Sequence, residues 1–376
     1  MTTLGDLIYD RRVRGIALQV ALVALLAWGV AELAGNAAEN LRRQNIASGF
    51  AFLNRTAGFD ISQRLIDYKN TDTYARAFWV ALANTLLVAG IGIVLATIAG
   101  FALGVARLSA NWLVAKLALV YVEVVRNVPL LLWLFVVYFG VLLRLPAPGE
   151  SYALPGGLLL NQRGLYFPWP VVTAPWIGAF SLAVAGLAIA LTMRRSAPKD
   201  GAPWWTLALV PAAIAALLAG PIEILRPVMG RFNLEGGAEI QPEFIALVTG
   251  LVTYTAAYIG EIVRAGIQSV SEGQRQAAAA LGLSEREALR FVVVPQALRA
   301  IIPPLTNQFV NLTKNSSLAV AVGYPDLVSV FAGTILNHTN QAVETIAITM
   351  AVYLTLSLTL AAVMNAFNAR VALKER

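Results

Sequence analysis

Four polar residues recur at helical spacing inside an apolar stretch near residue 310. The positions i, i+4, i+7 and i+8 hold Asn307, Asn311, Lys314 and Asn315, and Ser316 and Ser317 follow. This spacing puts the four on one face of a helix. The Lys314 ammonium could attract a carboxylate, while the amides and hydroxyls could replace its water. Polar groups within hydrocarbon usually face a cavity or a partner, so these residues are candidates for the wall of a solute path. The alternative is hydrogen bonding between helices, with Lys314 reaching outward to water.

A second polar stripe ends in a carboxylate and a guanidinium. Tyr254, Tyr258 and Glu261 stand at i, i+4 and i+7, and Arg264 follows one turn later. Residues three apart face each other on a helix, so we expect Glu261 and Arg264 to pair. Because they fall near the cytoplasmic end of their apolar stretch, a structural or gating role is favoured over contact with a solute.

A third polar cluster precedes a proline. Glu123, Arg126 and Asn127 share a helical face, and Pro129 follows. We expect Glu123 and Arg126 to neutralise each other at the inner membrane boundary, and Pro129 to kink the helix. Arg126 and Pro129 therefore join the structural or gating candidates.

Composition restricts where these residues can act. Of the 376 residues, 58% are hydrophobic and 13% are charged, which leaves too little polar surface for a soluble protein. Cysteine is absent and His338 is the single histidine, so disulfides, iron–sulfur clusters and histidine metal sites are excluded. We expect His338 to lie on the surface. Since no Gly-x-x-x-x-Gly-Lys-Ser/Thr sequence occurs, the chain is not expected to bind ATP, and no other cofactor is expected.

Eight stretches are long and apolar enough, or nearly so, to cross about 30 Å of hydrocarbon. They are residues 16–33, 77–105, 113–143, 175–193, 204–222, 244–263, 300–322 and 343–367. The predicted fold is an all-α integral membrane protein with about eight transmembrane helices. The first is expected to be an uncleaved signal anchor, because no clear Ala-x-Ala site follows it. The external segments 36–76 and 144–174 are expected to form small caps.

The distribution of charge predicts the orientation. Lys and Arg collect on the cytoplasmic side of membranes, and with the N-terminus inside, most of the 28 basic residues fall there. Both termini are therefore predicted to be cytoplasmic. The net charge of +7 is explained by this asymmetry, so no nucleic-acid partner is expected. Segment 36–76 places several Arg residues outside, but long loops translocate largely regardless of charge.

The cytoplasmic segment 265–299 carries signals for two short helices. Ser271 with Gln274 matches a capping box, and alanines and other strong helix formers follow. Gly282 can adopt the left-handed conformation that ends a helix. A helix of about ten residues is predicted to end there.

The second helix of this segment should begin at another capping box. Ser284 with Glu287 has the required spacing, and Pro295 should end or kink the helix before the next span. The prediction is a helix–glycine–helix elbow outside the bilayer. Its alanines would allow close approach of a partner, although packing on the chain's own helices is an equal alternative.

Segment 273–295 resembles the EAA loop of ABC-importer permeases. The matching residues are Gly273-Gln-Arg-Gln276-Ala277-Ala278-Ala-Ala-Leu-Gly282 and, after nine more, Val292-Val-Val-Pro295. The polar amino-acid uptake branch is indicated by Tyr258-Ile-Gly-Glu261-Ile-Val-Arg264, Pro295-Gln296-Ala297-Leu298-Arg299 and Arg126-Asn-Val-Pro129-Leu-Leu. Residues 79–143 and 244–367 carry the resemblance, with the motifs in order. Gln276 departs from the usual Glu and removes a charge.

The resemblance implies a permease subunit of an ATP-driven importer of L-amino acids in a bacterial-type inner membrane. An external binding protein would deliver the substrate, and separate ATPase subunits would use ATP. A second, different permease chain would complete the membrane part. The residues implied in ATPase coupling are Gly273, Arg275, Gln276, Ala277, Ala278, Gly282 and Pro295.

The resemblance also implies a division of the chain. A five-helix core would comprise residues 77–143 and 244–376, and the latter would include the coupling segment 265–299. Residues 1–76 would add a membrane anchor with an external loop, and residues 144–243 a two-helix insert.

The alternative weighed against this assignment is a secondary transporter of small polar solutes driven by an ion gradient. Lys314 and Glu261 would then be coupling residues. Sensitivity to ionophores without an ATP requirement would favour that alternative. A membrane enzyme is disfavoured because no catalytic arrangement emerges from the spans.

Overall fold

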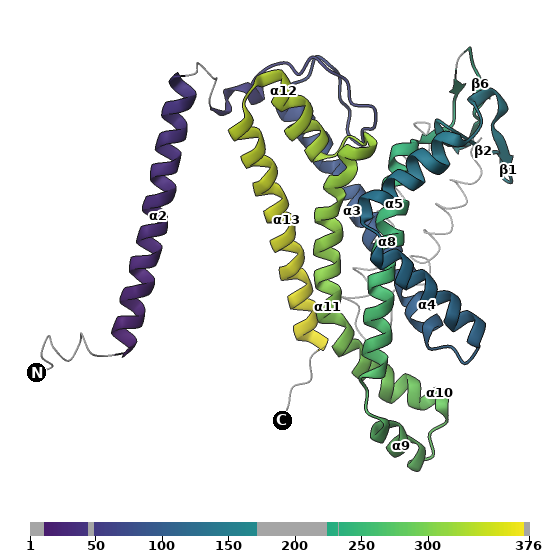
Figure 1. Cartoon of the computed structure of the whole chain (residues 1–376). Helices are drawn as coiled ribbons and strands as arrows, with labels where there is room; N and C mark the ends of the chain where they lie inside the picture. Colours follow the sequence, from purple (N-terminus) through teal and green to yellow (C-terminus); the bar gives the residue numbers. More distant parts are fainter. Residues whose placement is uncertain (1–10, 44–48, 171–223, 232, 372–376) are drawn as a thin grey trace, which may run out of the picture. The chain divides into compact units, whose positions relative to one another are not determined.

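The computed structural model describes residues 11–43, 49–170, 224–231 and 233–371 and is mostly helical (Figure 1). Two compact units divide the chain. Unit 1 comprises residues 1–90 and 266–376, and unit 2 comprises residues 91–265. The α-helices are α2 (Arg11–Arg43), α3 (Tyr74–Arg107), α4 (Trp112–Asn127), α5 (Leu130–Phe135), α8 (Pro242–Gln268), α9 (Glu272–Ala280), α10 (Glu285–Ala288), α11 (Val294–Asn315), α12 (Leu336–Thr339) and α13 (Ala342–Val371).

Five helical stretches can cross a membrane by length and composition. They are Arg14–Leu33, Tyr74–Arg107, Pro242–Gln268, Glu285–Val322 and Ala342–Arg370. Each contains or covers most of a predicted span, so these five predictions are confirmed as candidate spans. The predicted spans 175–193 and 204–222 lie outside the described residues.

The predicted span 113–143 is bent by 107° between α4 and α5, so the pair forms either one broken span or a re-entrant loop. Val128 takes an extended conformation with φ −103° and ψ 130°, and Pro129 follows as the first residue before α5. A proline disfavours helical backbone in the residue before it and has no N–H to donate. The proline signal was therefore right, but its effect is a break and not a mild kink.

Unit 1 holds an apolar core built partly from outside the spans. We call residues 49–73 the external loop, because the sequence predicts that they lie outside the membrane. Its Phe52, Ile61 and Tyr68 are buried, and they belong to a cluster that also includes Val80 of α3 and Phe331. The loop therefore packs as part of unit 1, more firmly than a surface cap would.

The helix that follows α11 is irregular. The 3₁₀ helix η6 (Ser316–Val322) ends at Gly323, whose φ of 79° is left-handed, and the π-helical stretch η7 (Val328–Ile335) begins after a short extended segment. Asn84 of α3 donates its Nδ2–H to the Pro325 carbonyl at 2.9 Å, and the Thr85 hydroxyl accepts from the Leu327 N–H at 3.0 Å. Irregular backbone persists within a membrane when protein groups satisfy it in this way.

Unit 2 brings α3 and α8 into close contact. A Cβ on Gly100 would lie 2.5 Å from Ile259, and one on Gly104 would lie 2.6 Å from Val263. Such distances leave no room for a side chain, so these two glycines permit the approach of the helices. The contact fixes the ends of α3 and α8 that carry charged residues.

A small sheet corrects the all-α prediction. Strands β1 (Tyr152–Leu154), β2 (Leu158–Asn161), β3 (Gly164–Phe167) and β8 (Ala238–Ile240) form an antiparallel sheet in the order β1-β2-β3-β8. Two-stranded ribbons pair β4 (Trp169–Pro170) with β5 (Ile224–Leu225) and β6 (Val228–Met229) with β7 (Leu234–Glu235). We call these strands the outer cap. A small cap was predicted for residues 144–174, but β8 lies more than seventy residues from its partner β3, and no local pattern reveals that pairing.

Short helical turns connect the main elements. They are η1 (Phe50–Asn54), the π-helical η2 (Val136–Val141), η3 (Leu142–Arg144), η4 (Pro148–Glu150) and the π-helical η5 (Leu289–Val293).

Candidate functional site

The predicted elbow forms where the sequence placed it. Helix α9 ends as the Leu283 N–H donates to the Ala278 carbonyl at 3.1 Å and the Gly282 N–H to the Ala279 carbonyl at 2.9 Å. Gly282 itself has a φ of 79°. Together these features make a Schellman motif, so the predicted glycine termination is confirmed. We call residues 272–288 the elbow.

Only one of the two predicted capping boxes forms. The Ser284 hydroxyl accepts from the Glu287 N–H at 3.4 Å, and the Glu287 carboxylate accepts from the Ser284 N–H at 3.0 Å. Ser271, by contrast, makes no side-chain capping bond among the described residues, so that prediction is wrong. The Gln274 carbonyl oxygen instead accepts from Gln296 of α11 at 3.3 Å. The contact with Gln296 thus uses the Gln274 side-chain oxygen that the capping box would direct to the Ser271 N–H.

Pro295 does not end the second elbow helix. The helix runs from Glu285 to Val322 as one candidate span, with a π-helical turn at η5 immediately before α11. The ring of a proline clashes with the carbonyl four residues earlier, and a widened π turn relieves that clash. Of the two predicted effects of Pro295, an end or a kink, the end does not occur, and the irregularity before the proline is a π-helical turn.

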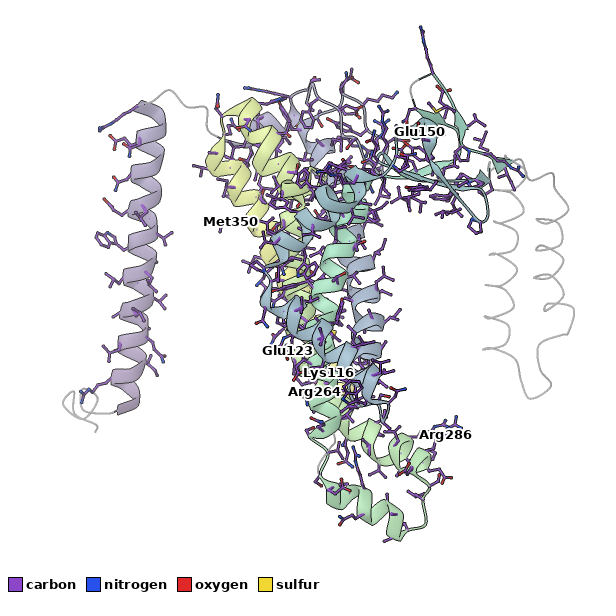
Figure 2. All side chains as sticks on the ribbon, turned by 45° about the vertical axis from the view of Figure 1, so that its right-hand side comes forward. Lys116, Glu123, Glu150, Arg264, Arg286 and Met350 are labelled. Atoms are coloured by element: carbon purple, nitrogen blue, oxygen red, sulfur yellow. The ribbon has the colours of Figure 1, made fainter. Side chains whose placement is uncertain are left out.

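The elbow has little core of its own. Within residues 272–288, all of which are described, only Ala278 is buried. Leu281 beside the glycine is 82% exposed, and the side chain of Arg286 projects from α10 (Figure 2). The coupling candidates Gly273, Arg275, Gln276, Ala277 and Gly282 are all exposed as well, and Pro295 is half-buried. The elbow packs on its own unit through Ala278 and leaves the rest of its surface open.

Glu261 is the centre of an ion cluster in unit 2. The Arg264 Nε–H donates to the Glu261 carboxylate at 3.1 Å, which confirms the predicted local pair. Arg107 of α3, whose side chain is 9% exposed, donates to the same carboxylate. Sequence reasoning missed Arg107 as a partner. The available signal was that both residues fall at predicted cytoplasmic ends of spans.

Arg126 has a different partner from the predicted one. Although both residues are described, Glu123 and Arg126 form no ion pair, and Glu123 is exposed. The Arg126 guanidinium lies 5.2 Å from the ring centre of Tyr258, and the Tyr258 hydroxyl donates to the Arg126 carbonyl at 3.4 Å. Cation–π contact with α8 thus replaces the predicted neutralisation.

The polar face of α11 divides into an open and a closed part. Asn307, Asn311 and Lys314 are exposed, whereas Phe309 and Leu312 on the other side are buried. The last three candidates turn away from this open face to differing degrees: Asn315 and Ser317 are half-buried, and Ser316 is buried and donates to the Thr313 carbonyl at 2.7 Å. The structure therefore brings three of the six path candidates onto one open polar face.

His338 is exposed, as predicted for a surface residue. Its ring packs edge-on against Phe59 of the external loop, with centroids 5.5 Å apart. Nothing in this contact requires a metal ion.

Comparisons with known proteins agree with the geometry. Residues 92–373 match the family described as "Binding-protein-dependent transport system inner membrane component". The general L-amino acid transport system permease protein AapQ of Rhizobium johnstonii is 49% identical, over 98% of this chain and 94% of its own. The glutamate/glutamine/aspartate/asparagine transport system permease protein BztB of Rhodobacter capsulatus is 40% identical, over 99% and 97%. A crystal structure of an amino acid ABC transporter with histidines shares the fold, with a TM-score of 0.50 and 23% identity over 79% of this chain and 95% of that one.

Proposed function

Because the chain belongs to the family of binding-protein-dependent transport system inner membrane components, we propose that it is the permease subunit of an ATP-driven importer of L-amino acids. The observation that carries the substrate class is similarity along almost the whole chain to relatives named for amino-acid transport. Family membership excludes the ion-gradient alternative, since a binding protein supplies the solute. Transport here does not require catalysis by this chain.

The elbow is the surface on which the ATPase subunits act. It exposes Leu281 and Arg286 in a segment predicted to be cytoplasmic, and the exposed small alanines of α9 allow the close approach of a partner. The chain runs directly from α8 through the elbow to α11, so a shift of the elbow moves the ends of both helices. ATP would drive the switch by binding better to one of two states.

A second permease covers the open polar face of α11. Asn307, Asn311 and Lys314 are exposed within a candidate span, and lipid is a poor solvent for all three. A partner chain facing them would enclose a polar path in which Lys314 attracts the α-carboxylate of an amino acid. We assign the partner to a different chain, as the resemblance of the motifs implies.

The ion cluster around Glu261 has a structural or gating role. It joins α3 to α8 through Arg107 and lies beside Arg264, at the end of unit 2 opposite the outer cap (Figure 2). Arg126 and Pro129 shape the adjoining break between α4 and α5. A cluster at the inner end can hold the helices in one state until the elbow moves.

The remaining assignments extend this proposal. Both termini are cytoplasmic, and the chain has eight spans, of which five form the permease core. Residues 1–76 add an anchor and external loop, and residues 144–243 add the insert that carries the outer cap.

Uptake by reconstituted vesicles tests the proposal. Vesicles containing this chain, its ATPase subunits and a second permease should accumulate labelled L-amino acids only with internal ATP and external binding protein. Ionophores that collapse ion gradients should leave uptake unchanged. Uphill uptake by this chain alone, without ATP, would contradict the proposal.

A further inference from the structure

The outer cap exposes apolar side chains on the paired strands β4 and β5 and on the strand β6 that follows them. Trp169 of β4 is 50% exposed, Leu225 of β5 is 49% exposed, and Val228 of β6 is 61% exposed. Trp169 and Leu225 stand opposite each other in the β4–β5 ribbon, in which every residue is exposed. Clustered apolar exposure of this kind marks a surface that is covered by something other than water.

The length of chain between the two ribbon strands places them beside the bilayer. Residues 171–223 connect β4 to β5 and include the predicted spans 175–193 and 204–222. Few residues separate Pro170 from the start of the first predicted span and Ile224 from the end of the second. At roughly 3.6 Å per residue, these connections can extend to at most about 18 Å and about 7 Å. The polar interface between hydrocarbon and water is roughly 5–8 Å thick on each side of a membrane. If the two predicted spans cross the bilayer as the proposed function has it, Ile224 falls within or at the edge of that layer.

The other side of the cap is attached just as closely. Strand β8 ends at Ile240 and the candidate span α8 begins at Pro242, so Gln241 alone separates sheet from helix. Among the described residues, the cap is thus joined to a candidate span by a single residue. A sheet tethered this closely cannot lift its ribbon far from the lipid surface.

We propose that the β4–β5 ribbon and β6 lie in the outer leaflet of the membrane, at the boundary between headgroups and acyl chains. Trp169 supplies the aromatic side chain that such interfaces favour. Arg226 directly follows Leu225 and is exposed, so its guanidinium can reach lipid phosphates while the neighbouring apolar side chains enter the acyl region. The ligand class is the phospholipid of the outer leaflet. The inference rests on the orientation and the two insert spans of the proposed function.

Nitroxide labels on single cysteines test this assignment, because the native chain has no cysteine to remove. The variants are Leu225→Cys and Val228→Cys, with Arg163→Cys in the exposed β2–β3 turn as the control in the same cap. Each is placed in the assembled transporter in vesicles of phosphatidylethanolamine and phosphatidylglycerol. Collisions with lipid-soluble oxygen and with a water-soluble nickel chelate are measured by power saturation. Two ribbon positions are used so that one poorly folding variant does not decide the result.

We expect oxygen to collide freely with the labels at 225 and 228 while the nickel chelate is excluded, and the opposite at 163. Free access of the chelate to both ribbon labels overturns the proposal. Exclusion of both reagents also overturns it, because a protein then covers the ribbon. The proposal is also overturned if the labels at 225 and 228 become protected only after the binding protein is added. That result would identify the ribbon as a docking surface for the binding protein. Uptake measured on the same vesicles separates these outcomes from a failure of the proposed function.

Discussion

The external loop and the elbow lie at opposite ends of α11 in unit 1 (Figure 1). They differ in how many of their side chains are buried. The loop, residues 49–73, buries Phe52 and Tyr68, and burial raises the pKa of Tyr68 to about 12. Its Tyr68 hydroxyl donates to the Phe59 carbonyl at 3.0 Å. The elbow, residues 272–288, buries Ala278 alone among its residues, all of them described, and exposes Leu281.

We interpret the external loop as a structural part of unit 1 and the elbow as the proposed docking surface for ATPase subunits. The loop contributes buried side chains to the core and is tied internally by bonds such as that from Tyr68 to Phe59, so it needs no further partner to hold its form. In the elbow α9 ends in a Schellman motif and α10 begins at a capping box, but Ala278 is the one buried side chain among residues 272–288. Short helices without packing are marginal in water, so the proposed docking of ATPase subunits would stabilise the elbow.

The largest effect is expected from Gly282→Leu. A leucine at a φ of 79° costs about 1–2 kcal/mol of backbone strain, although nothing lies within 4 Å of the site to clash with it. We expect the elbow to lose its turn and ATP-driven uptake to be abolished, while the chain still inserts. Gly282→Asn is the matched control, because asparagine tolerates left-handed backbone and should retain most uptake. Normal uptake by Gly282→Leu would remove the elbow from the mechanism.

Phe52→Ala should lower the stability of the core that the external loop helps to form. Removing a fully buried aromatic side chain costs about 3–5 kcal/mol of folding free energy. Thermal unfolding of the purified chain should show the loss, and Leu65→Ala at an exposed position of the same loop should change stability little. Co-purification of ATPase subunits with the folded fraction should stay normal. If Phe52→Ala left the melting temperature unchanged, the loop would not be part of the core.

Sequence reasoning found the features that depend on local chemistry. Gly282 and the Ser284 capping box were predictable because each rests on residues within one or two turns. The five candidate spans were predictable because apolar length suffices. The Arg107–Glu261 pair and the β3–β8 pairing were not, since they join segments more than seventy residues apart. Ser271 shows the same limit, because a contact between Gln274 and Gln296 overrides its local motif.

Lys314→Ala tests whether the exposed Lys314 side chain faces the proposed path between this chain and a second permease. A charge-assisted hydrogen bond contributes about 1.5–3 kcal/mol, so uptake at low substrate should fall about tenfold or more. Assembly with the other subunits should be unaffected, and Lys314→Arg should restore part of the uptake. Unchanged uptake at normal membrane levels would leave Lys314 outside the path.

Ser284→Ala should have the smallest effect. Loss of an N-cap costs about 0.5–2 kcal/mol, confined here to the start of α10. Hydrogen exchange of residues 285–288 should accelerate in the isolated chain, and ATPase binding should suppress the change. Equal exchange in the variant and the original chain would show that the capping box does not stabilise the elbow.

Thiol labelling compares the two regions directly. Leu281→Cys in the elbow and Leu65→Cys in the external loop are both exposed sites in a chain that otherwise has no cysteine. A maleimide reagent should modify both rapidly in the isolated detergent-solubilised chain. When the ATPase subunits are bound, labelling at 281 should be strongly suppressed and labelling at 65 unchanged. Equal labelling at 281 with and without the ATPase subunits would contradict the assignment of the elbow as their docking surface.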